Sequence, residues 1–190
     1  MTTVATANQM LETGGNAEGE LIERAKTDPR AFGTLYRRHY KPVVGYLYRR
    51  VGDEHTAEDL AGEAFLSAWK ALPRYRVTGV PFRAWVMRIA TNAANRWAKK
   101  QKREAARHTL AAEMKNQSNE PHDEADEART AMLALSTRHQ EVLSLHYVEG
   151  LSVDEVSAVL GCRPGTVKSR LSRGREALRQ ELLQRRAIDA

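Results

Sequence analysis

The sequence is poor in the features of disulfide-stapled and membrane-embedded proteins. It has 190 residues and one cysteine, Cys162, so no disulfide can form within the chain. No stretch approaches the roughly 20 apolar residues of a membrane-spanning helix. The first residues lack a basic segment followed by an apolar run, so no signal peptide is expected. We therefore expect a soluble, cytoplasmic protein without membrane insertion.

Motifs of catalysis and metal binding are also missing. The sequence has no glycine-rich phosphate loop. Metal-ligand spacing is absent among His108, His122, His139 and His146, and between them and Cys162. No Ser-His-Asp or Cys-His arrangement can be identified. The sequence therefore predicts no catalytic residue, no cofactor and no metal site.

What the chain does contain is positive charge and helical periodicity. Its 30 Lys and Arg against 24 Asp and Glu give a net charge of +6, which favours a polyanionic partner without naming one. Apolar residues recur at helical spacing, and no stretch alternates as a strand would. A polar, charge-segregated run after residue 100 is typical of a linker that lets two domains move partly independently. We predict an all-α fold with a disordered tail over 1–17, a helical domain over 18–100, a flexible linker over 101–127 and a small helical domain over 128–185.

Near the C-terminus, residues 151–178 have the pattern of a helix-turn-helix. Ser152 and Glu155 predict a capping box, Gly161 suits a positive φ at the end of the first helix, and Pro164 suits the first turn of the second. Such a helix pair fits the DNA major groove, although a solvated helical hairpin would have the same polarity. The outward residues of the second helix are Thr166, Lys168, Ser169, Arg170 and Arg173, and Arg163 and Pro164 of the turn join them as candidate DNA contacts.

Two further stretches carry patterned polar residues. Between Asp53 and Glu63 there are five acids and no Lys or Arg, which indicates either a solvated helix face or a protein-docking face. An outward Leu66 favours docking. The loop over 74–81 then interleaves aromatic and basic residues and leads into a helix with a stripe of Arg and Asn. This combination suits melted DNA, but a solvated helix over a tryptophan core has the same pattern. Upstream of both, Pro42 is expected to kink or break its helix.

Three segments in this order resemble the extracytoplasmic-function sigma factors of bacterial RNA polymerase, in the sigma-70 family. They are HTAEDLAGEAFLSAWKAL, PFRAWVMRIATNAANRW and LSVDEVSAVLGCRPGTVKSRLSRGREAL. The resemblance covers roughly residues 25–183. It implies that 18–100 is sigma region 2 and 128–185 is region 4. It also implies that the partners are core RNA polymerase, promoter DNA and an anti-sigma protein.

The resemblance also implies roles for residues. The outward residues of the helix-turn-helix would read the −35 element. The polymerase-docking set would be Asp59, Leu60, Glu63, Phe65 and Leu66. The −10 set, with a flipped base held near its tyrosine, isoleucine and asparagine, would be Tyr75, Arg76, Arg88, Ile89, Asn92 and Arg96.

Two other classes of protein remain open from the residues alone. A stand-alone helix-turn-helix regulator would need a ligand pocket or a dimer seam within residues 18–100. A structural helical interaction protein would need neither DNA surface.

Overall fold

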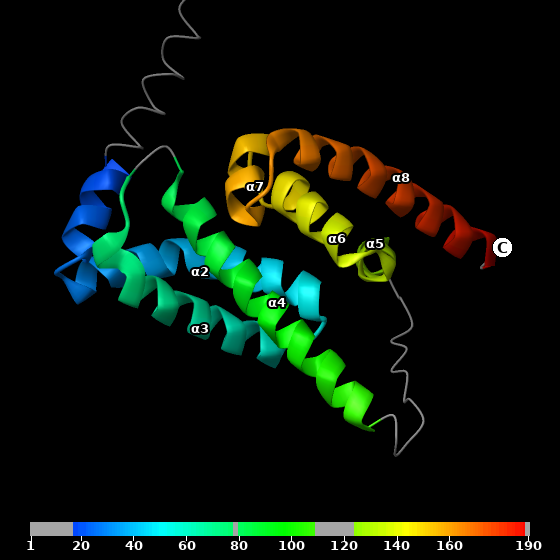
Figure 1. The fold of residues 1–190 in the computed structure, drawn as a ribbon, viewed down its shortest axis with the longest axis horizontal. Helices are drawn as coiled ribbons and strands as arrows, with labels where there is room; N and C mark the ends of the chain where they lie inside the picture. Colours follow the sequence, from blue (N-terminus) through cyan, green and yellow to red (C-terminus); the bar gives the residue numbers. More distant parts are fainter. Residues whose placement is uncertain (1–16, 78–79, 109–123, 189–190) are drawn as a thin grey trace, which may run out of the picture.

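The computed structural model describes residues 17–77, 80–108 and 124–188, and every regular element in them is helical. This confirms the all-α prediction. In the N-terminal region (residues 17–108), a first helix over 17–25 precedes α2 (Pro29–Val51), α3 (Glu54–Ala71), the 3-10 turn η1 (Leu72–Arg74) and α4 (Phe82–His108). The C-terminal region (residues 124–188) contains α5 (Glu124–Ala134), α6 (Thr137–Leu143), the π-helical turn η2 (Ser144–Val148), α7 (Val153–Leu160) and α8 (Pro164–Ile188). Figure 1 shows the two groups of helices side by side.

Helix α2 begins and ends at clear local signals but passes through a proline. Asp28 caps it by accepting a hydrogen bond from the Arg30 N–H at 2.8 Å, and Gly52 ends it with φ 77°. The helix is continuous through Pro42, so the expected break is wrong. A proline inside a helix costs about 3 kcal/mol. Burial of the residues around it, with Leu35 before and Leu47 after, offsets this cost.

The core of the N-terminal region lies where α2, α3 and α4 pack together. Tyr46 of α2 is fully buried, and its hydroxyl lies 2.9 Å from the Thr91 hydroxyl of α4. Burial raises the pKa of Tyr46 to about 12. A hydrogen-bonded tyrosine at this depth fixes the register of α2 against α4.

The helix-turn-helix forms as its sequence predicts. Ser152 accepts a hydrogen bond from the Glu155 N–H at 3.2 Å, while the Glu155 carboxylate accepts one from the Ser152 N–H at 2.7 Å. Gly161 ends α7 with φ 63°, and Pro164 is the first residue of α8. Val167 and Leu171 of α8 are buried, so the opposite side of the helix faces outward.

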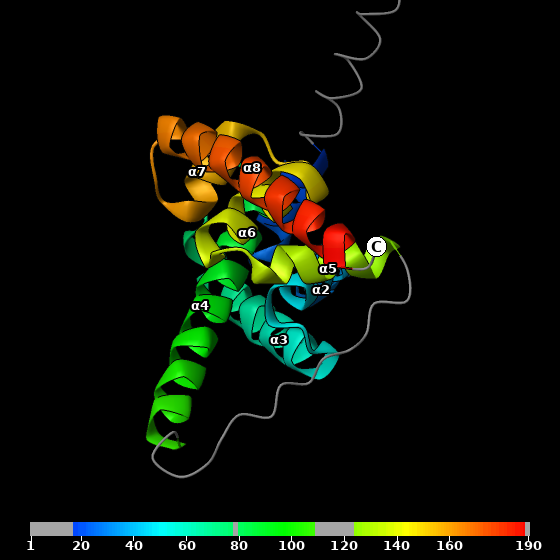
Figure 2. The same ribbon diagram turned by 90° about the vertical axis from the view of Figure 1, so that its right-hand side faces the viewer.

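Helices extend into the predicted linker from both sides. Helix α4 continues past residue 100 to His108, and Figure 2 shows its end projecting from the body of the molecule. Helix α5 begins at Glu124. Residues 109–123 of the predicted linker and residues 1–16 of the tail predicted over 1–17 lie outside the described residues, and residue 17 begins the first helix.

The two regions are packed against each other, whereas the sequence suggested partly independent domains. Helix α7 lies along α4, and α5 and η2 lie against α2. The Arg–Glu pairs that join them are 66 or more positions apart in the sequence, and the hydrogen bond from Asn95 to Glu141 joins residues 46 positions apart. Helical periodicity reports nothing about such distant pairing.

Candidate nucleic-acid interface

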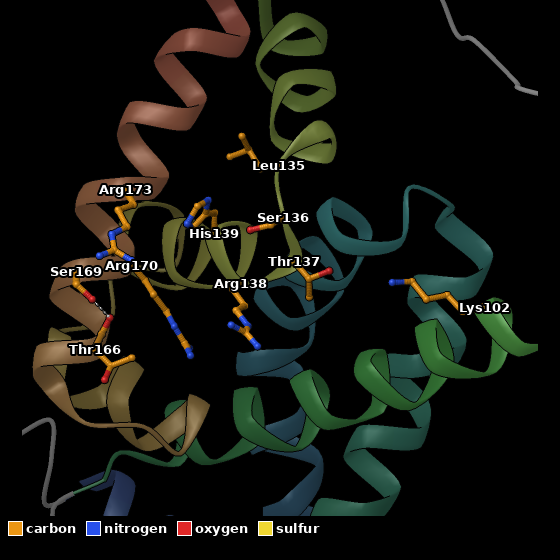
Figure 3. A pocket seen from close by; sticks show the side chains of 10 residues that line it. All are labelled: Lys102, Leu135, Ser136, Thr137, Arg138, His139, Thr166, Ser169, Arg170 and Arg173. Carbon is orange, nitrogen blue, oxygen red and sulfur yellow. Dashed lines mark hydrogen bonds between the residues drawn. The ribbon is translucent and has the colours of Figure 1, made fainter.

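The first half of α8 lines a basic groove that it shares with α6 and α4. The groove has a volume of about 810 Å³, and Figure 3 shows its side chains converging from three helices and the turn before α6. The residues of this basic groove are Lys102, Leu135, Ser136, Thr137, Arg138, His139, Thr166, Ser169, Arg170 and Arg173. They include four cationic side chains and no carboxylate. Such a surface suits a phosphate backbone.

The structure brings four of the seven predicted −35 residues into the basic groove. Ser169 and Arg173 are exposed, and Thr166 and Arg170 are half-buried. The Ser169 hydroxyl donates to the Thr166 carbonyl at 3.0 Å, and Arg170 Nη1 lies 3.9 Å from Cys162 Sγ. The remaining three are exposed and lie outside the groove: Arg163, Pro164 and Lys168.

Sequence reasoning missed two cations of the basic groove. Arg138 lies in the first turn of α6, two residues after the N-cap Ser136. Lys102 was assigned to the linker but belongs to the extended part of α4, from which it faces the groove (Figure 3). The Ser136 cap was visible in the sequence and could have placed Arg138, but no local signal could place Lys102 beside α8.

A smaller pocket lies between the loop after η1 and the start of α4. It has a volume of about 260 Å³ and contains Arg74, Tyr75, Arg76, Val80, Ala84, Trp85, Arg88 and Ala158. Tyr75 is only 7% exposed, and its hydroxyl donates to the Val80 carbonyl at 2.8 Å. The ring centroids of Tyr75 and Trp85 are 4.6 Å apart. Burial raises the pKa of Tyr75. Tyr75 is therefore a wall of this aromatic pocket rather than a free stacking platform.

The remaining predicted −10 residues follow one another along α4. Arg88 and Asn92 are exposed, and Ile89 is half-buried. Arg96 is exposed and donates from Nη2 to Glu63 Oε1 at 2.6 Å. Asn92 and Arg96 lie outside the aromatic pocket, so the structure separates a pocket near η1 from a polar stripe further along α4.

Only part of the polymerase-docking set implied by the resemblance is exposed on α3. Asp59 and Glu63 are exposed, and Leu66 is 54% exposed. Leu60 and Phe65 are instead core residues, at 6% and 2% exposure. Only the three exposed side chains can contact a partner directly. Leu60 and Phe65 lie in the core and hold the helix in place.

Some of the acidic residues serve the helix itself. The Asp53 carboxylate accepts a hydrogen bond from the Thr56 N–H at 2.8 Å and caps α3. This bond lowers the pKa of Asp53.

Two features are absent from the described residues. No helix there is long and apolar enough to span a membrane. No group of His, Cys, Asp and Glu side chains there is arranged to hold a metal ion.

The two regions correspond to two known protein families. Residues 35–104 match the model of sigma-70 region 2, and residues 125–178 match that of sigma-70 region 4. The chain therefore belongs to the sigma-70 family of RNA polymerase sigma factors. Its similarity to named relatives narrows this to the extracytoplasmic-function group.

Two relatives illustrate that similarity. The chain is 32% identical over 158 residues to the ECF RNA polymerase sigma factor BldN of Streptomyces coelicolor, covering 79% of this chain and 60% of BldN. It is 32% identical over 179 residues to the RNA polymerase sigma-H factor of Pseudomonas aeruginosa, covering 86% of this chain and 92% of that protein.

Solved structures agree with this assignment. The sigma factor RpoE of Bartonella quintana, in complex with the anti-sigma factor NepR, superposes with a TM-score of 0.69 at 25% identity, covering 80% of this chain and 96% of that one. CnrH, in complex with the cytosolic domain of CnrY, gives a TM-score of 0.67 at 28% identity, with 87% and 97% covered.

Family membership decides between the classes of protein left open by the residues. Most of the N-terminal region, residues 35–104, matches sigma-70 region 2, which favours a sigma factor over a stand-alone regulator with a sensing or dimerising domain. The chain is an RNA polymerase sigma factor that directs promoter recognition, and it is not an enzyme.

Proposed function

We propose that the basic groove reads the −35 element and that the loop after η1, together with α4, reads and opens the −10 element. In this assignment residues 18–100 act as region 2 and residues 128–185 as region 4. The helices of the N-terminal region extend to His108, and those of the C-terminal region begin at Glu124. The observation that carries the proposal is the convergence of α8, the start of α6 and Lys102 of α4 on one carboxylate-free groove.

The position and the chemistry of each side chain in the basic groove indicate whether it would contact bases or phosphates. Arg173 and Ser169 project from the middle of the exposed face of α8, where a helix in the major groove meets base edges. Arg138 lies on the flank of the groove and suits phosphate contacts. The remaining backbone contacts are assigned to Arg163, Pro164, Thr166, Lys168 and Arg170.

The aromatic pocket suits a single unpaired base. Its walls include Tyr75 and Trp85, and Arg76 and Arg88 supply positive charge beside it. Flat apolar walls and a nearby cation are what a flipped base requires. The exposed Asn92 offers both a donor and an acceptor to a neighbouring base, while Ile89 and Arg96 flank it along α4.

For core polymerase, we propose docking on the exposed residues Asp59, Glu63 and Leu66 of α3, which are supported by Leu60 and Phe65 in the core. An apolar side chain among carboxylates suits a basic protein partner with an apolar centre. RpoE was solved in complex with the anti-sigma factor NepR, and CnrH in complex with the cytosolic domain of CnrY. By analogy we assign an anti-sigma protein to this chain and place its action in the cytoplasm.

The test is reconstitution with core polymerase on a library of promoters randomised at both elements. We expect Arg173→Ala to relax base preference only in the upstream element and Arg88→Ala only in the downstream element. The assignment would be overturned if Arg173→Ala relaxed the downstream preference and Arg88→Ala the upstream one, or if both variants kept both preferences.

A further inference from the structure

A second cavity lies behind one wall of the aromatic pocket. This rear cavity, of about 230 Å³, is lined by Glu18 and Ile22 of the first helix and by Phe82 of α4. Tyr75 and Val80 line both the rear cavity and the aromatic pocket, and they are joined by a hydrogen bond at 2.8 Å. These two residues therefore form a partition between the aromatic pocket and the first helix.

The position of this partition depends on the rings that contact Tyr75. The Phe82 ring meets the Tyr75 ring edge-on at a centroid distance of 6.0 Å, and the Trp85 ring lies at 4.6 Å. Phe82 is only 1% exposed, so it joins the partition to the core. A pocket for an unpaired base needs walls whose side chains are fixed by packing. Movement of Phe82 would therefore change the shape of the aromatic pocket.

The first helix is connected to Phe82 by a buried histidine. His39 of α2 is 6% exposed, and the centroids of its ring and the Phe82 ring are 5.4 Å apart. His39 Nε2 lies 3.1 Å from Glu18 Oε1, and Arg38 Nη1 lies 3.3 Å from the same oxygen. A carboxylate can only accept hydrogen bonds, so Nε2 carries the hydrogen of this one. Glu18 thus fixes the orientation of the imidazole that packs on Phe82.

Two further observations tie the first helix to the partition. Burial raises the pKa of Tyr75, and the negative charge of Glu18 raises it further, so the carboxylate is close enough to act on the phenol. Ile22, one turn further along the first helix, is 2% exposed and anchors the helix in the core. The helix therefore brings both a charge and an apolar anchor to the rear of the aromatic pocket.

We propose that Glu18 is a positioning residue for promoter opening, and that it acts through His39 and Phe82 to hold Tyr75 in place as a wall of the aromatic pocket. The inference rests on the proposed function, in which this pocket holds a base unpaired from the −10 element. It gives a part in opening to the first helix, whose residues belong to neither proposed DNA surface.

The position of the wall is measured in the free, full-length protein. Trp85 lies against Tyr75, and the substitutions Trp69→Phe and Trp97→Phe leave Trp85 as the only tryptophan of the chain. Acrylamide quenching of Trp85 fluorescence then reports how closely the wall covers its ring. This measurement uses neither polymerase nor DNA, so it does not depend on which residues read the promoter.

Glu18→Gln is the test variant, and Glu23→Gln is the matched control. Glu23 lies in the same helix and pairs with Lys26 at 2.7 Å, so both substitutions remove the charge from one ion pair, but only Glu18 pairs with His39. We expect a higher quenching constant in Glu18→Gln and an unchanged one in Glu23→Gln. A parental quenching constant in Glu18→Gln would contradict the positioning role. An equal rise in both variants would do the same, since the effect would then come from helix stability alone.

Promoter opening is measured next, with core polymerase and in a form that separates closed-complex formation from isomerisation. Glu18→Gln should leave polymerase binding and the closed complex unchanged. It should slow opening by up to about five-fold, the limit for an ion pair that stays partly exposed. A pre-melted promoter should remove the difference.

Two outcomes would overturn the role in opening. One is loss of polymerase binding in Glu18→Gln, and the other is opening at the parental rate despite greater quenching. The promoter library tells the second outcome apart from failure of the proposed function. If Arg88→Ala still relaxes the downstream preference, the pocket reads the −10 element and only the positioning role fails.

A double-mutant cycle tests whether Glu18 acts through His39. His39→Gln should slow opening at least as much as Glu18→Gln, and the double variant should open no more slowly than His39→Gln, because both substitutions break one connection. Effects that multiply would mean that Glu18 does not act through the histidine. If His39→Gln fails to fold by circular dichroism, the comparison of Glu18→Gln with Glu23→Gln still decides the question.

Discussion

Arg96 of α4 donates a hydrogen bond to Glu63 of α3 at 2.6 Å, which joins a side chain proposed to contact DNA to one proposed to contact polymerase. Both side chains are more than half exposed. An ion pair of this kind contributes about 0–1 kcal/mol to stability. Because the ion pair is weak, binding of polymerase to Glu63 would break it at a small cost in free energy. Arg96 would then be available to contact DNA.

Substitution of Glu63 tests this exchange. Glu63→Gln should weaken binding to core polymerase and, by releasing Arg96, strengthen binding to single-stranded DNA. The salt dependence of DNA binding should steepen by up to about 0.7 in log–log slope for one added phosphate contact. Fluorescence polarisation with labelled oligonucleotides measures both quantities. Glu58→Gln, which changes another exposed acid of α3, is the control. If Glu63→Gln leaves the affinity for single-stranded DNA unchanged, Arg96 is not a DNA contact.

The basic groove separates base contacts from phosphate contacts. Arg173→Ala should cost about 1–3 kcal/mol on the preferred promoter and relax preference at one position of the −35 element. Lys168, exposed outside the groove, should act on phosphate. Lys168→Ala should therefore weaken all sequences alike and reduce the salt slope by about 1.

Quantitative footprinting of holoenzyme on promoter variants distinguishes these two effects. Arg179→Ala, on the later part of α8 and paired with Glu176, should leave both measurements unchanged. If Arg173→Ala weakens every sequence equally, the base-reading role belongs to another residue.

Much of the C-terminal region follows from local sequence signals. The Ser152–Glu155 capping box, the positive φ of Gly161 and the start of α8 at Pro164 all form as predicted. Each depends on residues within a few positions of one another, where capping and backbone preference dominate. The outward direction of Lys168 and Arg173 follows from the burial of Val167 and Leu171.

The remainder depends on contacts between distant residues. Helical periodicity places Leu60 and Phe65 on the apolar face of α3, whereas the resemblance placed them in the docking set. The element that covers this face is not visible in the sequence: it is α2, where Phe65 meets Tyr36 at a centroid distance of 4.8 Å. The aromatic side chain of Tyr75 could stack on a base, as the sequence suggests. Its burial, however, depends on contact with Trp85 and on the path of the loop, which carries the Val80 carbonyl. Continuity of α2 through Pro42 has the same origin, because tertiary packing outweighs a local cost.

Promoter opening tests the aromatic pocket and the polar stripe of α4 separately. Asn92→Ala should leave polymerase binding and upstream protection intact but abolish permanganate-reactive thymines near the start site. Tyr75→Phe keeps the ring and removes only the hydrogen bond to Val80, at about 1 kcal/mol of stability, so opening should largely persist. Tyr75→Ala empties a buried aromatic site at about 3–5 kcal/mol.

A mismatched bubble supplies the control for opening. If Asn92 acts by holding an unpaired base, transcription from a pre-melted promoter should be partly restored in Asn92→Ala. Normal opening of duplex promoters by this variant would rule out its proposed role.

The first helix gives a prediction for pH. The hydrogen bond between Glu18 and His39, at 3.1 Å, and the nearby Arg38 hold the pKa of Glu18 below its ordinary value, while partial burial opposes them. A lowered pKa in the folded state adds stability above the ordinary value of about 4.3 and loses it as the pH falls through the folded value. Glu18→Gln should therefore lower the unfolding free energy by at most about 1 kcal/mol at neutral pH after solvent screening.

Urea unfolding at pH 7 and at pH 3 measures this effect. The difference between Glu18→Gln and the parent protein should shrink as the pH falls through the lowered pKa of Glu18, because the parent carboxylate then also becomes protonated. Glu20→Gln, exposed on the same helix, is the control. A difference that is independent of pH would mean that Glu18 stabilises the helix by shape rather than by charge.

The π-helical turn η2 contains one residue more than an α-helical turn would, since the Glu149 N–H donates to the Ser144 carbonyl five positions earlier, at 2.9 Å. Each residue of a helix advances about 100° around the axis. Deletion of one codon from this turn would therefore swing the Glu149 carboxylate away from Arg49 and Arg83 while leaving the acid itself and α8 unaltered. In a lineage of such proteins, an in-frame insertion or deletion at this turn would change the contacts between the two regions in a single step, with no substitution at any residue proposed to read the promoter.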